Sequence, residues 1–213
     1  MSRDEGMEVS SVFLLDNQSG SMVDAELWDA ITEKNLADWE ADWIPQVFDM
    51  MKALKQKGVE RSLWPQSRHW HWSDKVRAVE ERLSNQCFSI VCDDVTQAMM
   101  ITDLTRRAQL EGQKNNHLVY IDFLETAPWN RAGLIGQPSK YSGAGSILIR
   151  AAIELSKLEG FCGRIGLHSL PQSNDFYAKA GMIDLGVDVN YQNLRYFEMT
   201  PEQADEFVIK GES

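Results

Sequence analysis

The sequence predicts a mixed α/β fold, in which a helical N-terminal elaboration precedes the sheet. From residue 86 onward, β-rich runs and stretches of helical periodicity follow one another in the order β-β-β-α-β-α-β-β. Before residue 86, apolar residues recur at helical spacing, and six of the seven tryptophans lie there. We expect residues 23–85 and 86–213 to form one compact domain, preceded at residues 1–22 by a polar start that is either mobile or loosely docked.

The N-terminal elements follow from the spacing of large apolar side chains. A helical pattern spans Asp24–Gly58, with Pro45 marking a boundary or the first turn of a second helix. Trp39 and Trp43 are four residues apart and share one helix face, which favours core packing over an aromatic cage for a cation. Another helix is expected from Ser73 to about residue 83.

The elements after residue 86 alternate in type. Two strands with a turn at residues 93–96 predict a hairpin, and a third strand, apolar on both faces, predicts a central position. A capping-box pattern at Thr200 predicts a last helix. The predicted strands are Cys87–Asp93, Gln97–Leu110, His117–Glu125, Gly163–Leu170, Met182–Val189 and Leu194–Met199, and the predicted helices before the last one are Gly143–Glu159 and Gln172–Ala180.

Composition narrows the classes of function. The net charge is −11 at pH 7 and the sequence pI is about 4.8. The first 60 residues carry 13 acidic and 5 basic side chains, so −8 of the net charge lies there. Proteins that bind nucleic acids or anionic membranes need a basic surface, so we expect neither partner. An amine-bearing substrate suits the acidic charge better.

Cysteine usage and hydropathy favour a cytoplasmic protein without a metal. Three cysteines, Cys87, Cys92 and Cys162, have the spacing of neither a disulfide framework nor a zinc site. Residues 1–8 are charged and lack the apolar core of a signal peptide. No apolar run approaches the roughly 18 residues that a membrane-spanning helix needs.

The segment from Lys140 to Gly145 carries the strongest chemical signal. It follows a predicted strand and opens a long amphipathic helix. Its two glycines, Gly143 and Gly145, let the backbone approach a ligand closely and turn several amide groups in one direction. The first turn of a helix adds unpaired N–H groups and a partial positive charge, and Lys140 adds a full one. Together these features favour a pyrophosphate site.

In its context, this segment resembles the acyl-CoA motif of the GNAT N-acetyltransferase superfamily. The family motif is Gln/Arg-x-x-Gly-x-Gly/Ala at a helix start, and Lys140-x-x-Gly143-x-Gly145 matches it except at the lysine. The strand at residues 117–125 would be the family's fourth, and the strand at residues 163–169 its fifth.

A second motif extends the resemblance. Asn174–Met182 is similar to the family's Phe/Leu-Tyr-x-x-x-Gly-Phe signature. The likeness covers about residues 86–199 and leaves out the first third of the chain. By this resemblance, residues 23–85 would line the acceptor side of the site.

The resemblance implies acetyl-CoA as acyl donor and assigns residues to it. In the family, the fourth and fifth strands splay apart and the acyl-CoA arm lies between them. Backbone amides of residues 143–146 would hold the pyrophosphate, and those of residues 124–126 would pair with the pantetheine and polarise the thioester carbonyl. The residues assigned to the cofactor are Leu124, Glu125, Thr126, Lys140, Tyr141, Ser142, Gly143, Ala144, Gly145, Ser146, Ser173, Phe176 and Tyr177.

The resemblance also implies catalytic roles. The acceptor amine must lose a proton, and Glu125 at the end of its strand is the first candidate base. Asp122 and His168 are alternatives, and a water chain without a dedicated base stays open. Tyr177 would protonate the departing CoA thiolate; the competing interpretation is a core tyrosine packed between helix and sheet.

The chain departs from the family pattern at three places. Lys140 keeps a positive charge but lacks the planar fork of arginine. Leu170 stands where the family often has an asparagine. The loop at residues 127–142 is long and rich in Gly and Pro. Such a loop is typical of a lid or specificity element, and Trp129 and Arg131 would then contact substrate or CoA. The alternative is an insertion packed on the surface.

We therefore expect an acyl-CoA-dependent N-acyltransferase that moves acetyl to a primary amine of a small molecule by direct attack, with no metal and no covalent intermediate. One rival is a non-catalytic CoA-binding or protein-interaction module on the same fold. Another is an acetyltransferase that acts on a protein amine or an aminoacyl-tRNA. A homodimer stays open, with residues 182–199 as a candidate pairing edge.

Overall fold

The structure, a computed structural model, describes residues 6–131 and 138–211. Its described part contains nine strands in the hydrogen-bonded order β6-β1-β2-β3-β4-β5-β7-β9-β8, with both parallel and antiparallel neighbours. The predicted mixed α/β class is confirmed. The chain divides into two compact units: the first comprises Met1–Arg82, Gln86–Met100 and Leu124–Ile147, and the second comprises Leu83–Asn85, Ile101–Phe123 and Leu148–Ser213.

The two units are not contiguous in sequence. β3 (Asn85–Cys92), β4 (Val95–Asp103), β5 (Val119–Thr126) and α4 (Ala144–Leu158) each contribute residues to both units. The units therefore cut across the segments 23–85 and 86–213 that the sequence suggested.

The first unit begins with a hairpin where the sequence suggested a polar start and then a helix. β1 (Val9–Asp16) and β2 (Ser21–Trp28) pair antiparallel along their whole length. In β2, buried Ala25 alternates with exposed neighbours, which is the period of a strand. Its apolar residues also fit the helical spacing of the residues after them, so periodicity alone extended the helix too far toward the N-terminus.

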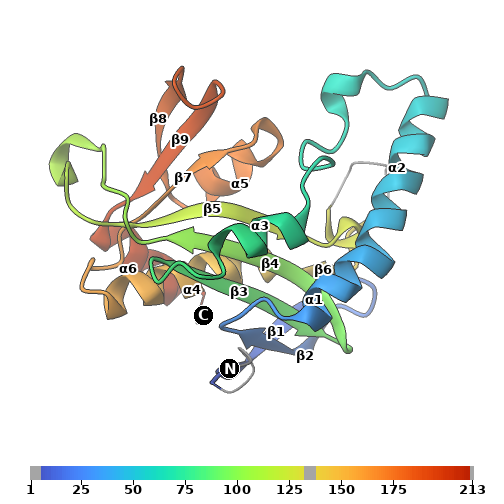
Figure 1. Ribbon diagram of the computed structural model, residues 1–213, viewed down its shortest axis with the longest axis horizontal. Helices are drawn as coiled ribbons and strands as arrows, with labels where there is room; N and C mark the ends of the chain where they lie inside the picture. The colour runs from blue at the N-terminus through green and yellow to red at the C-terminus, as the bar shows by residue number, and fades with distance from the viewer. Residues whose placement is uncertain (1–5, 132–137, 212–213) are drawn as a thin grey trace. The chain divides into compact units, whose positions relative to one another are not determined.

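The helical part of the first unit is confirmed from residue 33. α1 (Glu33–Asp38), a π-helical turn at Trp39–Trp43 and α2 (Ile44–Gln56) form one continuous run, drawn from blue to cyan in Figure 1. Pro45 lies in the first turn of α2, directly after the π-helical turn. Trp39 and Trp43 are buried, so the predicted core packing of this face is confirmed. A 3₁₀ turn (Arg61–Leu63) and α3 (Trp72–Val79) follow.

The predicted hairpin of β3 and β4 is present. Asp93 and Asp94, in the turn between the two strands, have φ of 52° and 58°. Aspartate tolerates this left-handed region better than most residues, and two such residues suit a tight hairpin turn. β4 ends at Asp103 rather than near residue 110, and a bend follows directly after this residue.

In the second unit, β7 and β9 each pair with two neighbouring strands. β7 (Ile165–Ser169) pairs parallel with residues 119–121 of β5 and antiparallel with β9 (Leu194–Met199), which in turn pairs with β8 (Ile183–Asp188). The parallel register ends at Ile121 and Leu167, although β7 continues to Ser169. Fully buried side chains of this unit include Ile101, Leu118, Leu148, Ile149, Ile153 and Phe197.

The later helices follow the sequence prediction closely. α4 is preceded by the short strand β6 (Tyr141–Ser142), and a 3₁₀ turn (Pro171–Ser173) leads into α5 (Asn174–Lys179). α6 (Pro201–Lys210) begins with the predicted capping box, in which Gln203 N donates to Thr200 Oγ1 at 3.3 Å and Thr200 N donates to Gln203 Oε1 at 3.0 Å. Two further 3₁₀ turns are Glu111–Gln113 and Pro128–Asn130.

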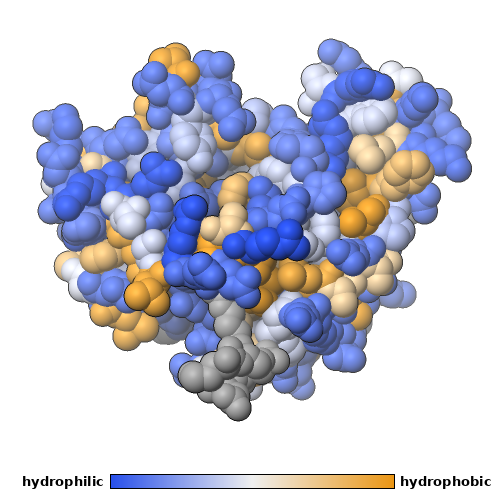
Figure 2. Space-filling view, in the orientation of Figure 1, coloured by the Kyte–Doolittle hydropathy of each residue, from blue (hydrophilic) through white to orange (hydrophobic). Residues whose placement is uncertain are grey.

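Hydrophilic residues predominate on the face drawn in Figure 2, as the acidic composition leads one to expect. Within residues 6–131 and 138–211, no helix is long and apolar enough to cross a membrane. The same residues include no group of three or more His, Cys, Asp and Glu side chains that could hold a metal ion. Cys87 and Cys92 are buried and Cys162 is exposed, and none of the three forms a disulfide in the described part of the chain.

The packing of β7 leaves no room for a side chain at Gly166. A Cβ there would lie 2.9 Å from Tyr196 Oη and 3.2 Å from Leu118 Cδ2. Gly166→Ala should lower the free energy of unfolding by about 1–3 kcal/mol, because both neighbours belong to a buried cluster. Urea unfolding measures this loss. Gly112→Ala, where a Cβ meets nothing within 4 Å, is the control, and equal stability of the two variants would contradict the packing.

Candidate functional site

The turn between β6 and α4 combines a glycine of positive φ with the first turn of a helix. Gly143 links the strand to the helix with φ of +105°, a conformation that side-chain-bearing residues rarely adopt. The first bond of the helix is donated by Ile147 N–H to Gly143 O at 3.0 Å. The N–H groups of Ala144, Gly145 and Ser146 therefore lie in the first turn of α4, where an α-helix supplies no carbonyl partner for them. They are available to an anion at this end of the helix.

Neighbouring segments fix this turn from two sides. β6 pairs with the end of β1, with Leu15 opposite Ser142 and Asp16 opposite Tyr141. On the other side, Tyr141 N donates to Asn130 Oδ1 at 2.9 Å, and Lys140 N donates to Trp129 O at 2.8 Å. The backbone leading to Gly143 is thus held by backbone and side-chain groups.

The side chains of Lys140 and Tyr141 stack on one another. Lys140 Nζ lies 4.7 Å from the centroid of the Tyr141 ring, and Tyr141 Oη donates to Asp93 Oδ2 at 2.6 Å. Burial, and then the hydrogen bond to Asp93, raise the pKa of the Tyr141 phenol. The Tyr141 phenol therefore remains a neutral donor, with the Lys140 side chain over its ring.

At the end of β5, the carboxylate of Glu125 is buried and held by two donors. Trp72 Nε1 donates to Glu125 Oε2 at 2.5 Å, and Arg131 Nη2 contacts Glu125 Oε1 at 2.5 Å. The side chains of Arg131 and Glu125 are 15% and 8% exposed, so this is an ion pair shielded from water. A carboxylate oxygen has two acceptor positions, so Glu125 retains capacity for a further hydrogen bond.

Arg131 uses the rest of its guanidinium group to join two more segments. Its Nε donates to Thr126 O at 2.9 Å, and its Nη1 donates to Ser67 Oγ at 3.0 Å. The sequence left open whether Arg131 and Trp129 contact substrate or pack on the protein. Arg131 turns toward Glu125, and Trp129 Nε1 donates to Gln97 Oε1 at 2.8 Å, so both side chains contact the first unit itself. Residues 132–137 of this loop lie outside the described residues.

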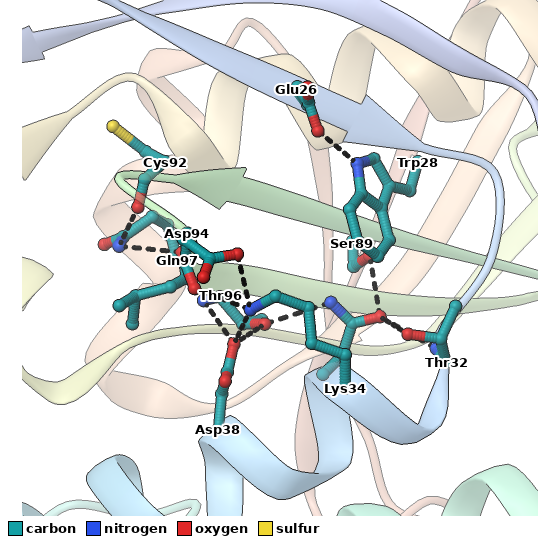
Figure 3. Close-up of polar contacts among 12 residues, drawn as sticks. Glu26, Trp28, Thr32, Lys34, Asp38, Ser89, Cys92, Asp94, Thr96 and Gln97 are labelled. Atoms are coloured by element: carbon teal, nitrogen blue, oxygen red, sulfur yellow. Dashed lines mark hydrogen bonds and ion pairs between the residues drawn. The ribbon is translucent and has the colours of Figure 1, made fainter.

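A polar network near the start of β4 connects this strand with α1 (Figure 3). Asp38 Oδ2 accepts from Thr96 N at 2.8 Å, from Thr96 Oγ1 at 2.6 Å and from Lys34 Nζ at 2.8 Å. Burial alone would raise the pKa of the Asp38 carboxyl, but these hydrogen bonds outweigh it and lower the pKa. Next to Thr96, Gln97 accepts from both Trp129 Nε1 and Asn130 Nδ2 through its side-chain oxygen.

Tyr177 lies in the second unit, on α5. Its side chain is buried and packs against Phe176 and Phe197, with ring centroids 5.1 Å and 5.9 Å away. Burial raises the pKa of the phenol, so Tyr177 stays protonated at neutral pH. Ser173 and Phe176, also assigned to the cofactor from the sequence, precede it on the 3₁₀ turn and on α5.

His168, an alternative base, lies between two partners in the second unit. Its Nδ1 is 2.6 Å from Tyr120 Oη, and its Nε2 is 3.1 Å from Asp188 Oδ2. The ring also stacks on Tyr191 at 3.9 Å. Burial, opposed by Asp188, lowers the pKa of His168. Both ring nitrogens are therefore already engaged, which disfavours direct contact with a substrate. Asp122, the other alternative, lies on β5 in the same unit.

The predicted cofactor residues fall into two groups. Leu124–Thr126 and Lys140–Ser146 belong to the first unit. The neighbouring residues Arg131 and Asn130 connect them, because Arg131 contacts Glu125 and Asn130 accepts a hydrogen bond from Tyr141 N. Ser173, Phe176 and Tyr177 belong to the second unit. Sequence reasoning missed the residues that hold the first group in place, which are Asn17, Ser67, Trp72 and Asn130. Their partners lie up to 125 residues away in the chain, and no local pattern marks such a pair.

Similar solved structures include N-acetyltransferases. PaiA N-acetyltransferase from Thermoplasma acidophilum, in complex with coenzyme A, is 12% identical over 92% of this chain and 99% of that chain, with a TM-score of 0.46. A mutant of the AtaT toxin bound to acetyl-CoA and the C-terminus of the antitoxin AtaR is 13% identical over 65% and 81%, with a TM-score of 0.45. A mutant of the BH1408 protein from Bacillus halodurans is 18% identical over 76% and 96%, with a TM-score of 0.47.

No protein-family model and no curated protein matches the sequence. The likeness to these solved structures, at identities of 12–18% and TM-scores of 0.45–0.47, assigns neither an activity nor a residue role to this chain.

Arg131 should contribute more to stability than a surface cation does. Arg131→Met leaves the Glu125 carboxylate buried without its counter-ion, which should lower the free energy of unfolding by about 3–5 kcal/mol. Lys210→Met, which breaks an exposed helical pair with Glu206, is the control and should change stability little. Denaturant unfolding compares the two variants. Similar losses would show that the Arg131 pair is no stronger than a surface pair.

Proposed function

We propose that this protein is an acyl-CoA-dependent N-acyltransferase that transfers an acetyl group from acetyl-CoA to a primary amine of a small molecule. The observation that carries the proposal is the turn at Gly143, where a strand passes directly into the first turn of α4. The φ of Gly143 is +105°, and the amides of residues 144–146 that follow it belong to the first turn of α4, where the helix supplies no carbonyl partner for them.

In this proposal, the turn binds the pyrophosphate of CoA. Three first-turn amides and the helix dipole supply hydrogen bonds and a partial positive charge, and Lys140 adds a full charge beside them. The backbone of residues 124–126 pairs with the pantetheine arm, and an amide of this strand end polarises the thioester carbonyl. Because Arg131 holds Thr126 O and the Glu125 side chain, this strand end is rigid before the ligand arrives.

The reaction proceeds by direct attack. The neutral amine nitrogen bonds to the thioester carbon, the carbonyl oxygen takes the negative charge, and the carbon–sulfur bond then breaks. The amine proton passes to a base, for which Glu125 is our first choice because it is the carboxylate at the end of β5. Tyr177 gives its proton to the departing CoA thiolate, and burial keeps that phenol in the protonated form that this role needs.

Acceptors with a positive charge suit the acidic protein better than anionic ones. The net charge of −11 attracts a protonated amine from solution. The same charge disfavours an aminoacyl-tRNA, whose phosphates it repels. A small-molecule amine is therefore our proposed acceptor.

A second function, a CoA-binding module without catalysis, is favoured by one specific observation. Both proposed catalytic groups are engaged or enclosed, since both oxygens of Glu125 accept hydrogen bonds and Tyr177 is 6% exposed. Such a module uses the same turn for the pyrophosphate and has no turnover. Binding and catalysis therefore need separate tests.

The binding test is Gly145→Glu, which puts a carboxylate at the proposed pyrophosphate site. Calorimetry should detect acetyl-CoA binding by the wild type and a loss of affinity of about 100-fold or more in the variant, because like charges at short range repel. Gly112→Glu, at an exposed position in a different unit, should bind normally. Absence of binding by the wild type at millimolar acetyl-CoA would refute the proposal.

The catalytic test separates the roles of Glu125 and Tyr177 from ligand binding. With a panel of small amines, release of free CoA should fall about 100-fold or more in Glu125→Gln and in Tyr177→Phe, while acetyl-CoA affinity stays near that of the wild type. Glu26→Gln, the same change at an exposed position of β2, is the matched control and should keep the activity of the wild type. If Glu125→Gln releases CoA as fast as Glu26→Gln does, Glu125 is not the base. If the wild type binds acetyl-CoA but no amine releases CoA, the binding module is the better description.

A further inference from the structure

We propose that Asn17, in the turn of the β1–β2 hairpin, is a positioning residue for the turn that binds acyl-CoA. The N-terminal hairpin is then part of the cofactor site and not an appendage. This inference rests on the proposed function, because it concerns the same turn. It adds a residue that lies outside the region in which the sequence resembles a known family.

The side chain of Asn17 reaches the backbone and hydroxyl groups that lead into Gly143. Its Nδ2 lies 2.9 Å from Ser139 O, 2.9 Å from Ser139 Oγ and 2.8 Å from Ser142 Oγ. Its Oδ1 accepts from Ser142 Oγ at 3.1 Å. One amide therefore contacts the residue before Lys140 and the residue before Gly143.

The backbone of Asn17 strengthens the same connection. Asn17 N donates to Lys140 O at 2.9 Å, directly beyond the β1–β6 pairing at Asp16 and Tyr141. Lys140 thus has its carbonyl held by Asn17 and its N–H by Trp129 O. A residue fixed at both backbone groups has little freedom in φ and ψ, so the direction in which its side chain leaves the turn is fixed as well.

The hairpin that carries Asn17 is itself firmly placed in the first unit. β1 pairs with β2 over its full length, β2 pairs with β3 through residues 26–28, and Leu14 is fully buried. The turn after Asn17 is ordered by Asp16, whose carboxylate accepts from Gln18 N at 3.0 Å and from Ser19 Oγ at 2.8 Å. A rigid support of this kind lowers the ordering cost that a ligand would otherwise meet on binding.

Two variants test the inference against a matched control. Asn17→Ala removes all side-chain bonds to the turn and should raise the Kd for acetyl-CoA about tenfold. Ser142→Ala removes the partner hydroxyl. The double variant should raise the Kd by less than the product of the two separate fold-changes, because both substitutions remove the same contact. Gln18→Ala changes the next side chain of the same exposed turn and should bind like the wild type.

A second ligand separates positioning from a general loss of structure. S-acetylpantetheine lacks the pyrophosphate and the nucleotide, so Asn17→Ala should bind it as tightly as the wild type does, measured by its competition with acetyl-CoA. Urea unfolding should show little loss of stability, because the contacts of Asn17 are exposed to solvent. If both ligands weaken equally, or if Asn17→Ala binds acetyl-CoA like Gln18→Ala, the positioning role is overturned. If the wild type itself does not bind acetyl-CoA, the proposed function fails instead.

Discussion

The first unit depends most on the buried ion pair between Arg131 and Glu125. Two opposite charges that are both shielded from water must stay together, because separating them would leave a charge in a poorly solvated place. Since Arg131 also bonds Ser67 and Thr126 O, the same cation joins the segment before α3, the end of β5 and the chain that follows it. Trp72 adds a neutral donor to the second carboxylate oxygen, so the position of α3 is tied to the same group.

This constraint extends along the chain to the turn before α4. One residue before Arg131, Asn130 bonds both Tyr141 N and the side chain of Gln97. Gln97 follows Thr96, which is held by Asp38 in α1 (Figure 3). Groups from α1, β4 and the 3₁₀ turn after β5 therefore support the backbone that leads into Gly143. Hydrogen bonds that share partners in this way restrict one another, so the geometry of the turn is a property of the unit and not of its glycines alone.

Sequence reasoning succeeded where a feature is encoded in neighbouring residues. Alternation and helical spacing predicted the order of elements after residue 86, and β9 spans the predicted Leu194–Met199. The capping box at Thr200 and the glycine turn at Gly143 are local signatures and were also predicted. The β1–β2 hairpin was missed because β1 lies in a segment that was expected to be a polar start, and the apolar residues of β2 also fit the helical spacing that follows; pairing with β6 and β3 places both strands in the sheet. Asn17 and Arg131 have distant partners, which one sequence does not reveal.

The engagement of Glu125 limits how it can act as a base. When its carboxylate takes a proton, the Arg131 guanidinium is left beside a neutral group with little access to water, which is costly. Glu125 is therefore better suited to pass a proton on at once than to keep it. Each oxygen has a lone pair beyond those that Trp72 and Arg131 use, so an incoming amine or water can bond without displacing either donor. The ion pair that orders the site and the proton transfer that we assign to it are thus compatible, provided that the proton leaves before the pair separates.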